Sequence, residues 1–325
     1  MKPAISLVIP VFNEEASIPA LLERVQALVA SLGAATAEVL FVDDHSSDRT
    51  AEMLKPFCAA HPGFRYLRLA RNSGSHVAIL AGMAHARGDC AVFLAADLQD
   101  PPELIPQMLE QWRAGKHVVW AVRAQREGVS WLDRALSNTF YLMLNRLGGA
   151  AVPPTGSDFA LLDRKVVDAL LASAGTNPSL GGEIARLGFS QGEVPYTKQA
   201  RAFGHSKWKL EHKLKAFADA FVSFSYAPLR AMSYLGFLSS LLGLVYAVVI
   251  IVLRLTAKVG IPGWSSLMVV VLLLGGVQMV MLGILGEYLW RTLDAARRRP
   301  NYFLEDSAGL LPEAERAPAS GPGRP

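Results

Sequence analysis

Two contrasting patterns of apolar and polar residues divide the chain. In the first half, short apolar runs alternate with stretches in which apolar residues recur every three or four positions. The runs 5–11, 39–42, 64–69, 90–96 and 118–122 have the length and composition of buried strands. The periodic stretches between them predict helices, so the pattern indicates βαβ units, a parallel sheet and an α/β fold.

Polar residues stand at the ends of successive predicted strands. They are Asn13-Glu14, Asp43-Asp44, Asp97 and Arg123. Because the carboxyl ends of parallel strands form the ligand-binding edge of an open α/β sheet, this recurrence outlines a candidate site. The sequence has no Gly-x-Gly-x-x-Gly after the first strand and no Gly-Lys-[Ser/Thr] loop, which argues against the common dinucleotide and P-loop sites.

Asp97 ends an apolar run and is followed by Pro101-Pro102-Glu103, where we expect a helix to begin. A carboxylate at such a strand end suits Mg²⁺ or Mn²⁺, which in turn holds phosphate oxygens. The alternative is that Asp97 and Asp100 cap the helix, since Asp is a favoured N-cap residue. This stretch alone favours neither interpretation.

The second half contains two uncharged apolar stretches, 233–253 and 259–286, each long enough to cross a bilayer as a helix. Hydrophobic residues make up 51% of the 325 residues and charged residues 18%, which also favours a membrane protein. A buried core hairpin is the alternative, but two runs of this length in one chain argue against it.

Basic residues flank the two stretches unevenly. Arg230 precedes them and Arg291 and 297–299 follow them, whereas Arg254 and Lys258 lie between them. The positive-inside rule then places both ends of the hairpin in the cytoplasm.

The segment before the first stretch has a polar and an apolar face. Lysines crowd 207–215, while an apolar stripe recurs every three or four residues at Leu210, Leu214, Phe217, Phe221 and Phe224. The pattern predicts a basic amphipathic helix at the membrane surface. A helix packed on the preceding domain is the alternative.

Four segments occur in this order along the chain: Pro10-Val11-Phe12-Asn13-Glu14, Asp43-Asp44-His45-Ser46-Ser47-Asp48, Ala96-Asp97-Leu98-Gln99-Asp100-Pro101-Pro102-Glu103 and Arg201-Ala202-Phe203-Gly204-His205-Ser206-Lys207-Trp208. Together they resemble the family 2 glycosyltransferases that charge a polyprenyl phosphate with a sugar. This group includes dolichol-phosphate mannose synthase and the bacterial polyisoprenyl-phosphate glycosyltransferases.

The resemblance implies a GT-A (Rossmann-like) nucleotide-sugar-binding domain with a C-terminal two-helix transmembrane hairpin. It further implies an inverting transfer from a nucleotide-sugar donor to undecaprenyl or dolichyl phosphate, with Mg²⁺ or Mn²⁺ on the donor diphosphate. The product would be a lipid-linked sugar for cell-envelope glycan or glycoprotein modification.

Site residues follow from the same resemblance. Pro10, Phe12, Glu14 and Asp44 would bind the nucleotide base and ribose. Asp97 and Gln99 would lie at the metal and diphosphate. Asp158 would orient the acceptor phosphate or act as base. The phosphate-binding cations and hydroxyl would be Arg123, Arg126, Arg201, Ser206 and Lys207.

Several positions depart from the family pattern. Ala95 replaces the first Asp of Asp-Ala-Asp-Leu-Gln, and Ser157 and Ala160 replace the Gly and Arg that flank Asp158-Phe159. Ser75-His76 replaces a frequent Lys-Glu. The loss of one carboxylate is compatible with metal binding, because Mg²⁺ commonly uses one or two carboxylates plus substrate phosphates. The missing arginine would lower the positive charge near the acceptor.

We therefore expect a cytoplasmic catalytic domain at 1–206 and an interfacial helix region at 207–230. Two transmembrane helices would follow at 231–292, and a disordered cytoplasmic tail at 293–325. The partners are a nucleotide sugar, a polyprenyl phosphate and the lipid bilayer of the inner membrane, with no nucleic acid.

Other functions remain open on the sequence. A catalytically silent membrane scaffold is supported by Ala95, and a glycosyltransferase with another lipid acceptor is a second alternative. A processive polysaccharide synthase would carry Gln-x-x-Arg-Trp and more spans, which the sequence lacks. The sugar, the nucleotide, the lipid length and the formation of a homo-oligomer are left undetermined.

The arginine asymmetry predicts the topology of the hairpin. A reporter fused after Arg299 should report the cytoplasm, and one inserted at Pro262 should report the opposite side. The reverse pattern of the two reporters would contradict a cytoplasmic catalytic domain.

Overall fold

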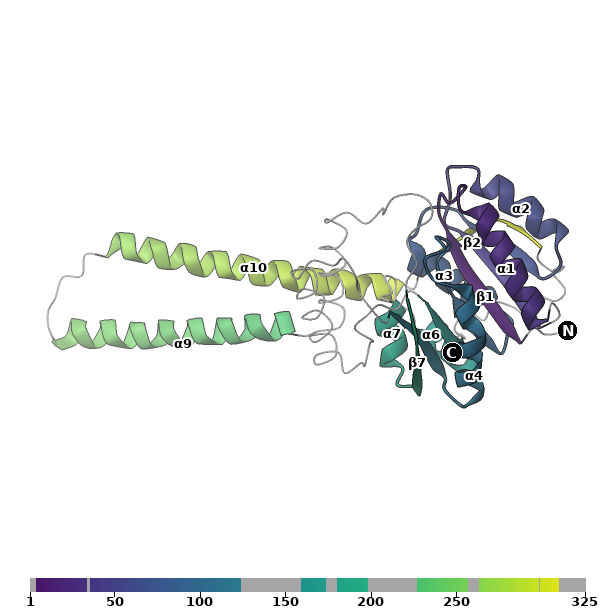
Figure 1. Ribbon diagram of the computed structural model, residues 1–325. Coiled ribbons are helices and arrows are strands. Elements are labelled where there is room, and N and C mark those ends of the chain that lie inside the picture. The colour runs from purple at the N-terminus through teal and green to yellow at the C-terminus, as the bar shows by residue number, and fades with distance from the viewer. Residues whose placement is uncertain are drawn as a thin grey trace, which may run out of the picture. The chain divides into compact units, whose positions relative to one another are not determined.

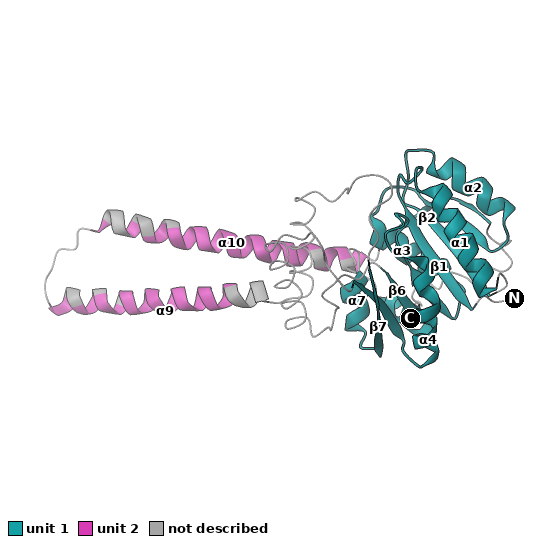
Figure 2. Cartoon of the chain, in the orientation of Figure 1, with its two compact units in different colours: residues 1–212, 300–325 teal, residues 213–299 magenta. Residues whose placement is uncertain are grey.

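The computed structural model describes residues 4–33, 36–123, 159–173, 180–197, 227–256, 263–297 and 299–309. The chain forms two compact units, which are residues 1–212 with 300–325, and residues 213–299 (Figure 2). The first unit is a β-sheet covered by helices on both faces, and the second is a helical hairpin.

The sheet has the strand order β7-β5-β6-β4-β1-β2-β3-β8. Its strands are β1 (Ile5–Val11), β2 (Ala37–Asp43), β3 (Phe64–Leu69), β4 (Cys90–Phe93), β5 (Val118–Arg123), β6 (Ala160–Asp163), β7 (Gln191–Tyr196) and β8 (Leu304–Ala308). Strands β1 to β4 are parallel, as predicted. The expectation of an all-parallel sheet is wrong, because β6 runs antiparallel to β4 and β5, and β8 runs antiparallel to β3.

Alternating side chains of the central strands supply two separate cores. On β1, Leu7 and Ile9 belong to one core and Val8 to the other. The first core lies under α1 (Ile18–Leu32), α2 (Thr50–Ala60) and α4 (Ile105–Arg113), which follows the short 3₁₀ helix η1 (Pro102–Leu104). The second lies under α3 (Ser75–His85), α6 (Arg164–Ser173) and α7 (Leu180–Arg186), on the opposite face of the sheet (Figure 1).

Helix α3 packs unusually close to the sheet because Gly82 faces it. A Cβ at Gly82 would lie 2.3 Å from Val8 Cγ1 and 2.9 Å from Val42 Cγ2. The helix begins after Gly74, whose φ is 92°. This close packing on β1 and β2 positions the start of α3 against the loop that follows β2.

The edge of the sheet at which β1, β2 and β3 begin contains a buried ion pair between Arg65 and Glu38. Arg65 Nη1 donates to Glu38 Oε2 at 3.0 Å, and Ser6 Oγ donates to Glu38 Oε1 at 2.6 Å. Both ions are less than 10% exposed, and together they connect β1, β2 and β3. These charges belong to the scaffold, because ligands of such sheets bind at the carboxyl edge.

The second unit consists of α9 (Ala227–Thr256) and α10 (Trp264–Arg297). The two helices meet at Gly236, where a Cβ would lie 3.4 Å from Met281 Cε. Large apolar side chains point outward, with Tyr234 72%, Phe237 71% and Leu255 78% exposed. Such an apolar surface is typical of a membrane-embedded or protein-covered hairpin.

Length and composition suit a membrane crossing in one stretch of the described helices, Leu273–Asp294 of α10. Helix α9 has a shorter apolar stretch, Met232–Tyr246. Two crossings therefore stay a prediction. Most of the predicted interfacial helix region, 207–230, lies outside the described residues, and 227–230 form the start of α9.

The expectation of a disordered tail from residue 293 is wrong for its described part. Helix α10 continues to Arg297, and Leu304–Ala308 forms strand β8 at the edge of the sheet. The backbone of β3 would otherwise present unpaired N–H and C=O groups at this edge, and β8 pairs with them. The second unit is therefore an insertion within the first along the sequence.

Candidate active site

Three residues with a left-handed backbone mark one edge of the sheet. Asn13, His45 and Leu98 have φ of 53°, 62° and 59° and lie in the segments after β1, β2 and β4. Each such conformation costs about 1–3 kcal/mol, so surrounding contacts must hold it. Because β4, β1 and β2 are parallel neighbours, the three segments meet at the carboxyl edge, as predicted. We call them the β1 loop (12–17), the β2 loop (44–49) and the β4 loop (94–101).

Hydrogen bonds join the β1 loop to the β2 loop and the start of α2. The N–H of Asn13 donates to Ser46 Oγ at 2.9 Å, and the N–H of Ser47 donates to Asn13 Oδ1 at 2.8 Å. The N–H of Glu14 donates to Thr50 Oγ1 at 2.9 Å. These motif hydroxyls accept backbone N–H groups from across the gap between the strands, which holds the two loops in one arrangement.

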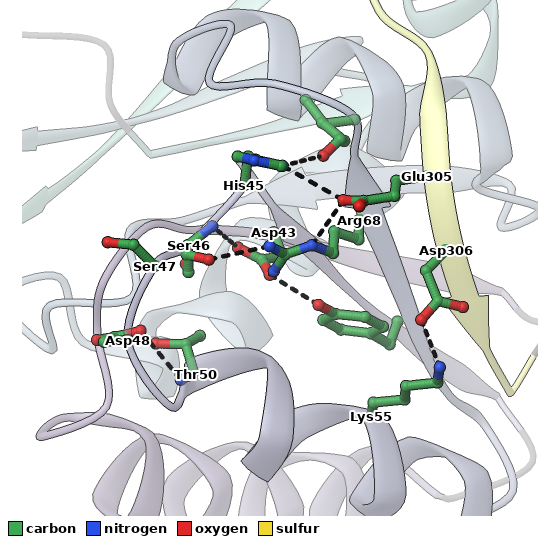
Figure 3. A network of polar contacts seen from close by, with 12 residues as sticks. Asp43, His45, Ser46, Ser47, Asp48, Thr50, Lys55, Arg68, Glu305 and Asp306 are labelled. Carbon is green, nitrogen blue, oxygen red and sulfur yellow. Dashed lines mark hydrogen bonds and ion pairs between the residues drawn. The ribbon is translucent and has the colours of Figure 1, made fainter.

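Asp43 anchors the β2 loop from within the sheet (Figure 3). Its fully buried carboxylate accepts from the N–H of Ser46 at 2.8 Å, the hydroxyl of Tyr66 at 2.7 Å and Nη1 of Arg68 at 2.7 Å. Burial and the bond to Asp43 raise the pKa of the Tyr66 hydroxyl, which keeps it a donor. The first Asp of the Asp43-Asp44 pair is therefore committed to the loop.

Asp44 connects the β2 loop to the start of α3. Its carboxylate accepts from the N–H groups of Ser73 at 2.7 Å and Gly74 at 2.8 Å, and the residue is 3% exposed. Burial raises the pKa of Asp44, although the two backbone hydrogen bonds oppose this rise. Asp44, which the sequence predicts to bind the nucleotide, thus lies at the expected edge of the sheet. Its carboxylate oxygens point toward backbone amides.

The other predicted nucleotide ligands lie at the same edge. Pro10, Phe12 and Glu14 are partly exposed at the end of β1 and in the β1 loop. The hydroxyl of Ser17 donates to Glu14 Oε2 at 2.9 Å, which orients that carboxylate. Their contact with a nucleotide stays a prediction.

Asp97 and Gln99 lie in the β4 loop, and Asp97 does not cap the following helix. The N–H of Gln99 donates to Asp97 Oδ1 at 3.2 Å. The N-cap residues of η1 and α4 are Pro101 and Leu104, and neither helix start has a side-chain cap. The capping interpretation is therefore wrong for Asp97, and also for Asp100, whose Oδ1 accepts from the hydroxyl of Tyr196.

Arg123 belongs to a second polar group at this edge. It ends β5 and is the register partner of Tyr196, which ends β7. Arg123 and the buried Asp100 both contact the Tyr196 hydroxyl. Burial, followed by the neighbouring carboxylate, raises the pKa of Tyr196. Strands β5 and β7 thus present a cation and a phenol beside the Asp100 carboxylate of the β4 loop.

The described residues contain no group of three or more His, Cys, Asp and Glu side chains suited to a metal. Asp97 is partly exposed and belongs to the loop rather than to a helix cap. A single hard carboxylate of this kind fits Mg²⁺ or Mn²⁺ whose other ligands are substrate phosphates and water.

Five predicted site residues lie outside the described residues. They are Arg126, Asp158, Arg201, Ser206 and Lys207.

One family departure has a different meaning in the structure. Ala160 is fully buried in β6, where it pairs with Phe93 of β4 and Trp120 of β5 and belongs to the second core. The side chain at this position packs against apolar neighbours, so Ala160 is a core residue.

Three further polar residues of this edge were missed by the sequence analysis. They are Tyr196, Arg68 and Glu305. A usable signal existed for Arg68, because Phe64–Leu69 places arginines among buried residues. For Glu305 no local signal existed, since its role depends on the pairing of β8 with β3.

Comparison with known families matches two parts of the chain. Residues 6–171 match the model of glycosyl transferase family 2. Residues 227–291 match the model of the GtrB C-terminal hairpin, which covers α9 and most of α10.

Three relatives extend over nearly the whole chain. The "Uncharacterized glycosyltransferase YkcC" of Bacillus subtilis is 38% identical and covers 94% of each chain. The "Undecaprenyl-phosphate 4-deoxy-4-formamido-L-arabinose transferase" of Pseudomonas aeruginosa is 37% identical over 97% of this chain and 94% of its own. The "Prophage bactoprenol glucosyl transferase homolog" of Escherichia coli is 33% identical over 93% of this chain and 98% of its own.

The contacts between the loops predict unequal effects for two adjacent serines. Ser46→Ala should lower the free energy of unfolding by about 1–3 kcal/mol, because the N–H of Asn13 loses its acceptor. Ser47→Ala should change it by less than about 0.5 kcal/mol, because Ser47 is exposed and its backbone N–H keeps the bond to Asn13. Urea unfolding of both variants, followed by near-ultraviolet circular dichroism, measures the difference. Equal effects would show that the Ser46 hydroxyl does not hold the β1 loop.

Proposed function

The chain belongs to glycosyl transferase family 2, and on that premise we propose that it transfers a sugar from a nucleotide sugar to a polyprenyl phosphate. One observation carries this proposal: a GT-A domain with its loops gathered at one sheet edge continues, in the same chain, into a hairpin with an apolar outer surface. The first part suits a water-soluble donor, and the second suits a membrane-bound acceptor. Relatives named for undecaprenyl phosphate or bactoprenol, each covering more than 90% of the chain, support it.

The donor nucleotide would bind at the β1 and β2 loops. Pro10, Phe12 and Glu14 would contact base and ribose, and Asp44 would complete this part of the site. Asp44 already accepts two backbone N–H groups, so it would meet the nucleotide in a fixed orientation. This pre-organisation would lower the entropy lost when the donor binds.

The donor diphosphate would lie at the β4 loop. Asp97 would hold Mg²⁺ or Mn²⁺ there and Gln99 would bind beside the diphosphate, so that charge on the leaving nucleoside diphosphate would be neutralised. Asp97 fits this role because it is a partly exposed carboxylate held by the N–H of Gln99.

The acceptor phosphate would be bound by cations. Arg123 extends from the end of β5 beside Tyr196, which fixes its position at the carboxyl edge. Arg126, Arg201, Ser206 and Lys207 would surround the phosphate from the segments outside the described residues. These cations would offset the repulsion between two anionic substrates, which is the main obstacle to the reaction.

The chemical step would be displacement at the anomeric carbon of the donor sugar. An oxygen of the lipid phosphate forms the new bond to that carbon, and the bond to the nucleoside diphosphate breaks. The acceptor phosphate is ionised near neutral pH, so Asp158 would mainly orient it, with a secondary role as base. Attack from the face opposite the leaving group inverts the anomeric configuration.

The hairpin would anchor the enzyme in the inner membrane, with the catalytic domain on the cytoplasmic side. The exposed apolar residues of α9 and α10 support membrane insertion, because exposure of such a large apolar surface to water is energetically unfavourable. The names of these relatives refer to transfer of different sugars, glucose and a formamido-arabinose. They therefore do not identify the sugar that this chain would transfer. The product would be a lipid-linked sugar for later transfer to a cell-envelope glycan or glycoprotein.

Release of nucleoside diphosphate tests this function. Purified full-length protein with Mg²⁺ or Mn²⁺ should release it from one or more of a panel of nucleotide sugars only when undecaprenyl phosphate is added. Asp97→Asn should remove nearly all turnover. Asp89→Asn, an exposed Asp at the opposite end of β4, should leave turnover unchanged.

Three results would contradict parts of this proposal. Absence of release with every sugar and lipid would favour a silent scaffold. Release that depends on another lipid would assign another acceptor. Full turnover of wild type after exhaustive chelation, or of Asp97→Asn, would remove the metal role of Asp97.

The segment 201–207, which contains Arg201, Ser206 and Lys207 and would bind phosphate, supplies a second prediction. Arg201→Lys should lower the transfer rate by tenfold or more, about 1.4 kcal/mol of transition-state stabilisation, because Lys lacks the bidentate grip of Arg on phosphate. Lys207→Ala should also slow transfer, while both variants stay in the membrane. Lipid-linked sugar formed per minute in matched membranes measures this, with Arg186→Lys on the exposed face of α7 as control. Wild-type rates in both variants would make the segment a linker.

A further inference from the structure

We propose that Arg68 and Glu305 are positioning residues for the nucleotide-sugar donor, through which the C-terminal strand β8 holds the β2 loop in its binding conformation. This inference rests on the proposed function, because it assumes that the donor binds at the β1 and β2 loops. Neither residue is expected to touch the donor.

Strand β8 is fixed to the edge of the sheet next to the loop. It pairs antiparallel with β3, with Arg68 opposite Asp306 and Leu69 opposite Leu304. The N–H of Ala70 donates to Phe303 O at 2.9 Å, which extends the pairing beyond the end of β3. At the other end, Gly309 has φ of 68°, and a Cβ there would lie 2.3 Å from Phe64 O, so only glycine fits this close approach. The strand therefore has a defined register.

Arg68 connects three parts of this region with one planar group (Figure 3). Nη1 donates to Asp43 Oδ2 at 2.7 Å, Nη2 to Ser46 O at 3.0 Å and Nε to Glu305 Oε2 at 2.9 Å. The side chain is 18% exposed, and Asp43 is fully buried. A guanidinium can satisfy three acceptors in fixed directions at once, whereas an ammonium cannot reproduce that geometry. Arg68 thus holds the backbone of Ser46 in two ways. It donates directly to the Ser46 carbonyl, and it orients the Asp43 carboxylate, which accepts from the Ser46 N–H.

His45 connects Glu305 to the β2 loop a second time. Its Nδ1 lies 3.3 Å from Glu305 Oε2 and 3.1 Å from Leu69 O. His45 is the residue of this loop with φ of 62°, a conformation that a non-glycine residue adopts only when contacts hold it. Glu305 therefore meets the loop at its strained residue as well as at Arg68.

The loop conformation in turn controls the β1 loop. Ser46, held by Arg68, is the residue whose hydroxyl accepts from the N–H of Asn13. A chain of contacts thus runs from Glu305 through Arg68 and Ser46 to Asn13, and from there to the two loops assigned to base and ribose. Loss of Glu305 should loosen donor binding and leave the acceptor site unchanged.

The neighbouring residue of β8 provides a matched control. Asp306 forms an ion pair with Lys55 of α2, away from the β2 loop. Both carboxylates are partly exposed, with 48% of Glu305 and 38% of Asp306 accessible. Removal of the Asp306 carboxylate costs its ion pair with Lys55, whereas removal of the Glu305 carboxylate costs the hydrogen-bonded ion pair with Arg68 and the contact with His45.

Steady-state kinetics of the full-length protein test the inference. Glu305→Ala should raise KM for the nucleotide sugar by about threefold, the scale expected for a partly exposed ion pair. Arg68→Lys should raise it by about tenfold, since two of the three directed bonds are lost. In both variants KM for undecaprenyl phosphate should stay at the wild-type value. Asp306→Asn should leave both constants unchanged.

Two further measurements separate positioning from general destabilisation. The thermal unfolding midpoint of Glu305→Ala should fall by no more than that of Asp306→Asn, while its affinity for UDP or GDP, whichever wild type binds, should fall with the rise in KM. Hydrogen exchange of 44–49 should increase in Glu305→Ala and not in Asp306→Asn.

The outcomes also separate this inference from the function it rests on. If wild type transfers sugar but Glu305→Ala and Asp306→Asn have equal KM for the donor, the positioning role is wrong and the function stands. If KM for donor and acceptor rise together, β8 acts only on stability, which also overturns the role. If wild type transfers no sugar and binds neither nucleotide, the proposed function itself fails.

Discussion

The hydrogen bonds between the β1 loop and the β2 loop are the interaction on which the candidate site depends. Asn13 and His45 have backbone conformations that each cost about 1–3 kcal/mol, and neither is stable without its neighbours. Ser46, Ser47 and Thr50 offset this cost by pairing backbone N–H and side-chain groups across the two loops. The same contacts leave the edge rigid, so that a ligand would meet groups already in place.

Carboxylates that look equivalent in the motifs have different tasks. Asp43 is fully buried and holds the β2 loop together with Arg68, and Asp44 holds the start of α3. Asp97 lies in the β4 loop, is partly exposed, and accepts from the N–H of Gln99. Burial distinguishes them, because a carboxylate that ligates a metal must keep oxygens accessible to the ion and its phosphates.

The sheet buries its large apolar side chains, whereas the hairpin exposes them. In the sheet, side chains such as Phe41 and Trp120 are fully buried under helices, whereas Phe237 and Leu255 of α9 are more than 70% exposed. The chain nevertheless returns from α10 to complete the sheet with β8. The catalytic unit is thus not finished until residues beyond the hairpin have paired, which places Glu305 next to a loop formed by the first 50 residues.

Local sequence determined the elements that carry a continuous apolar pattern. The β-branched run at Ile5–Val11 and the run at Phe64–Leu69 predicted two strands at their observed bounds, and the long apolar stretches predicted the two helices of the hairpin. The polar strand ends predicted the candidate edge, because parallel neighbours must bring their carboxyl ends together. Tertiary structure alone decided β6 and β8, because each is placed by antiparallel pairing with a strand distant in sequence. It also decided that Asp97 is not a helix cap and that Arg68 holds a loop, because a side chain's partners depend on packing between segments that local sequence does not specify.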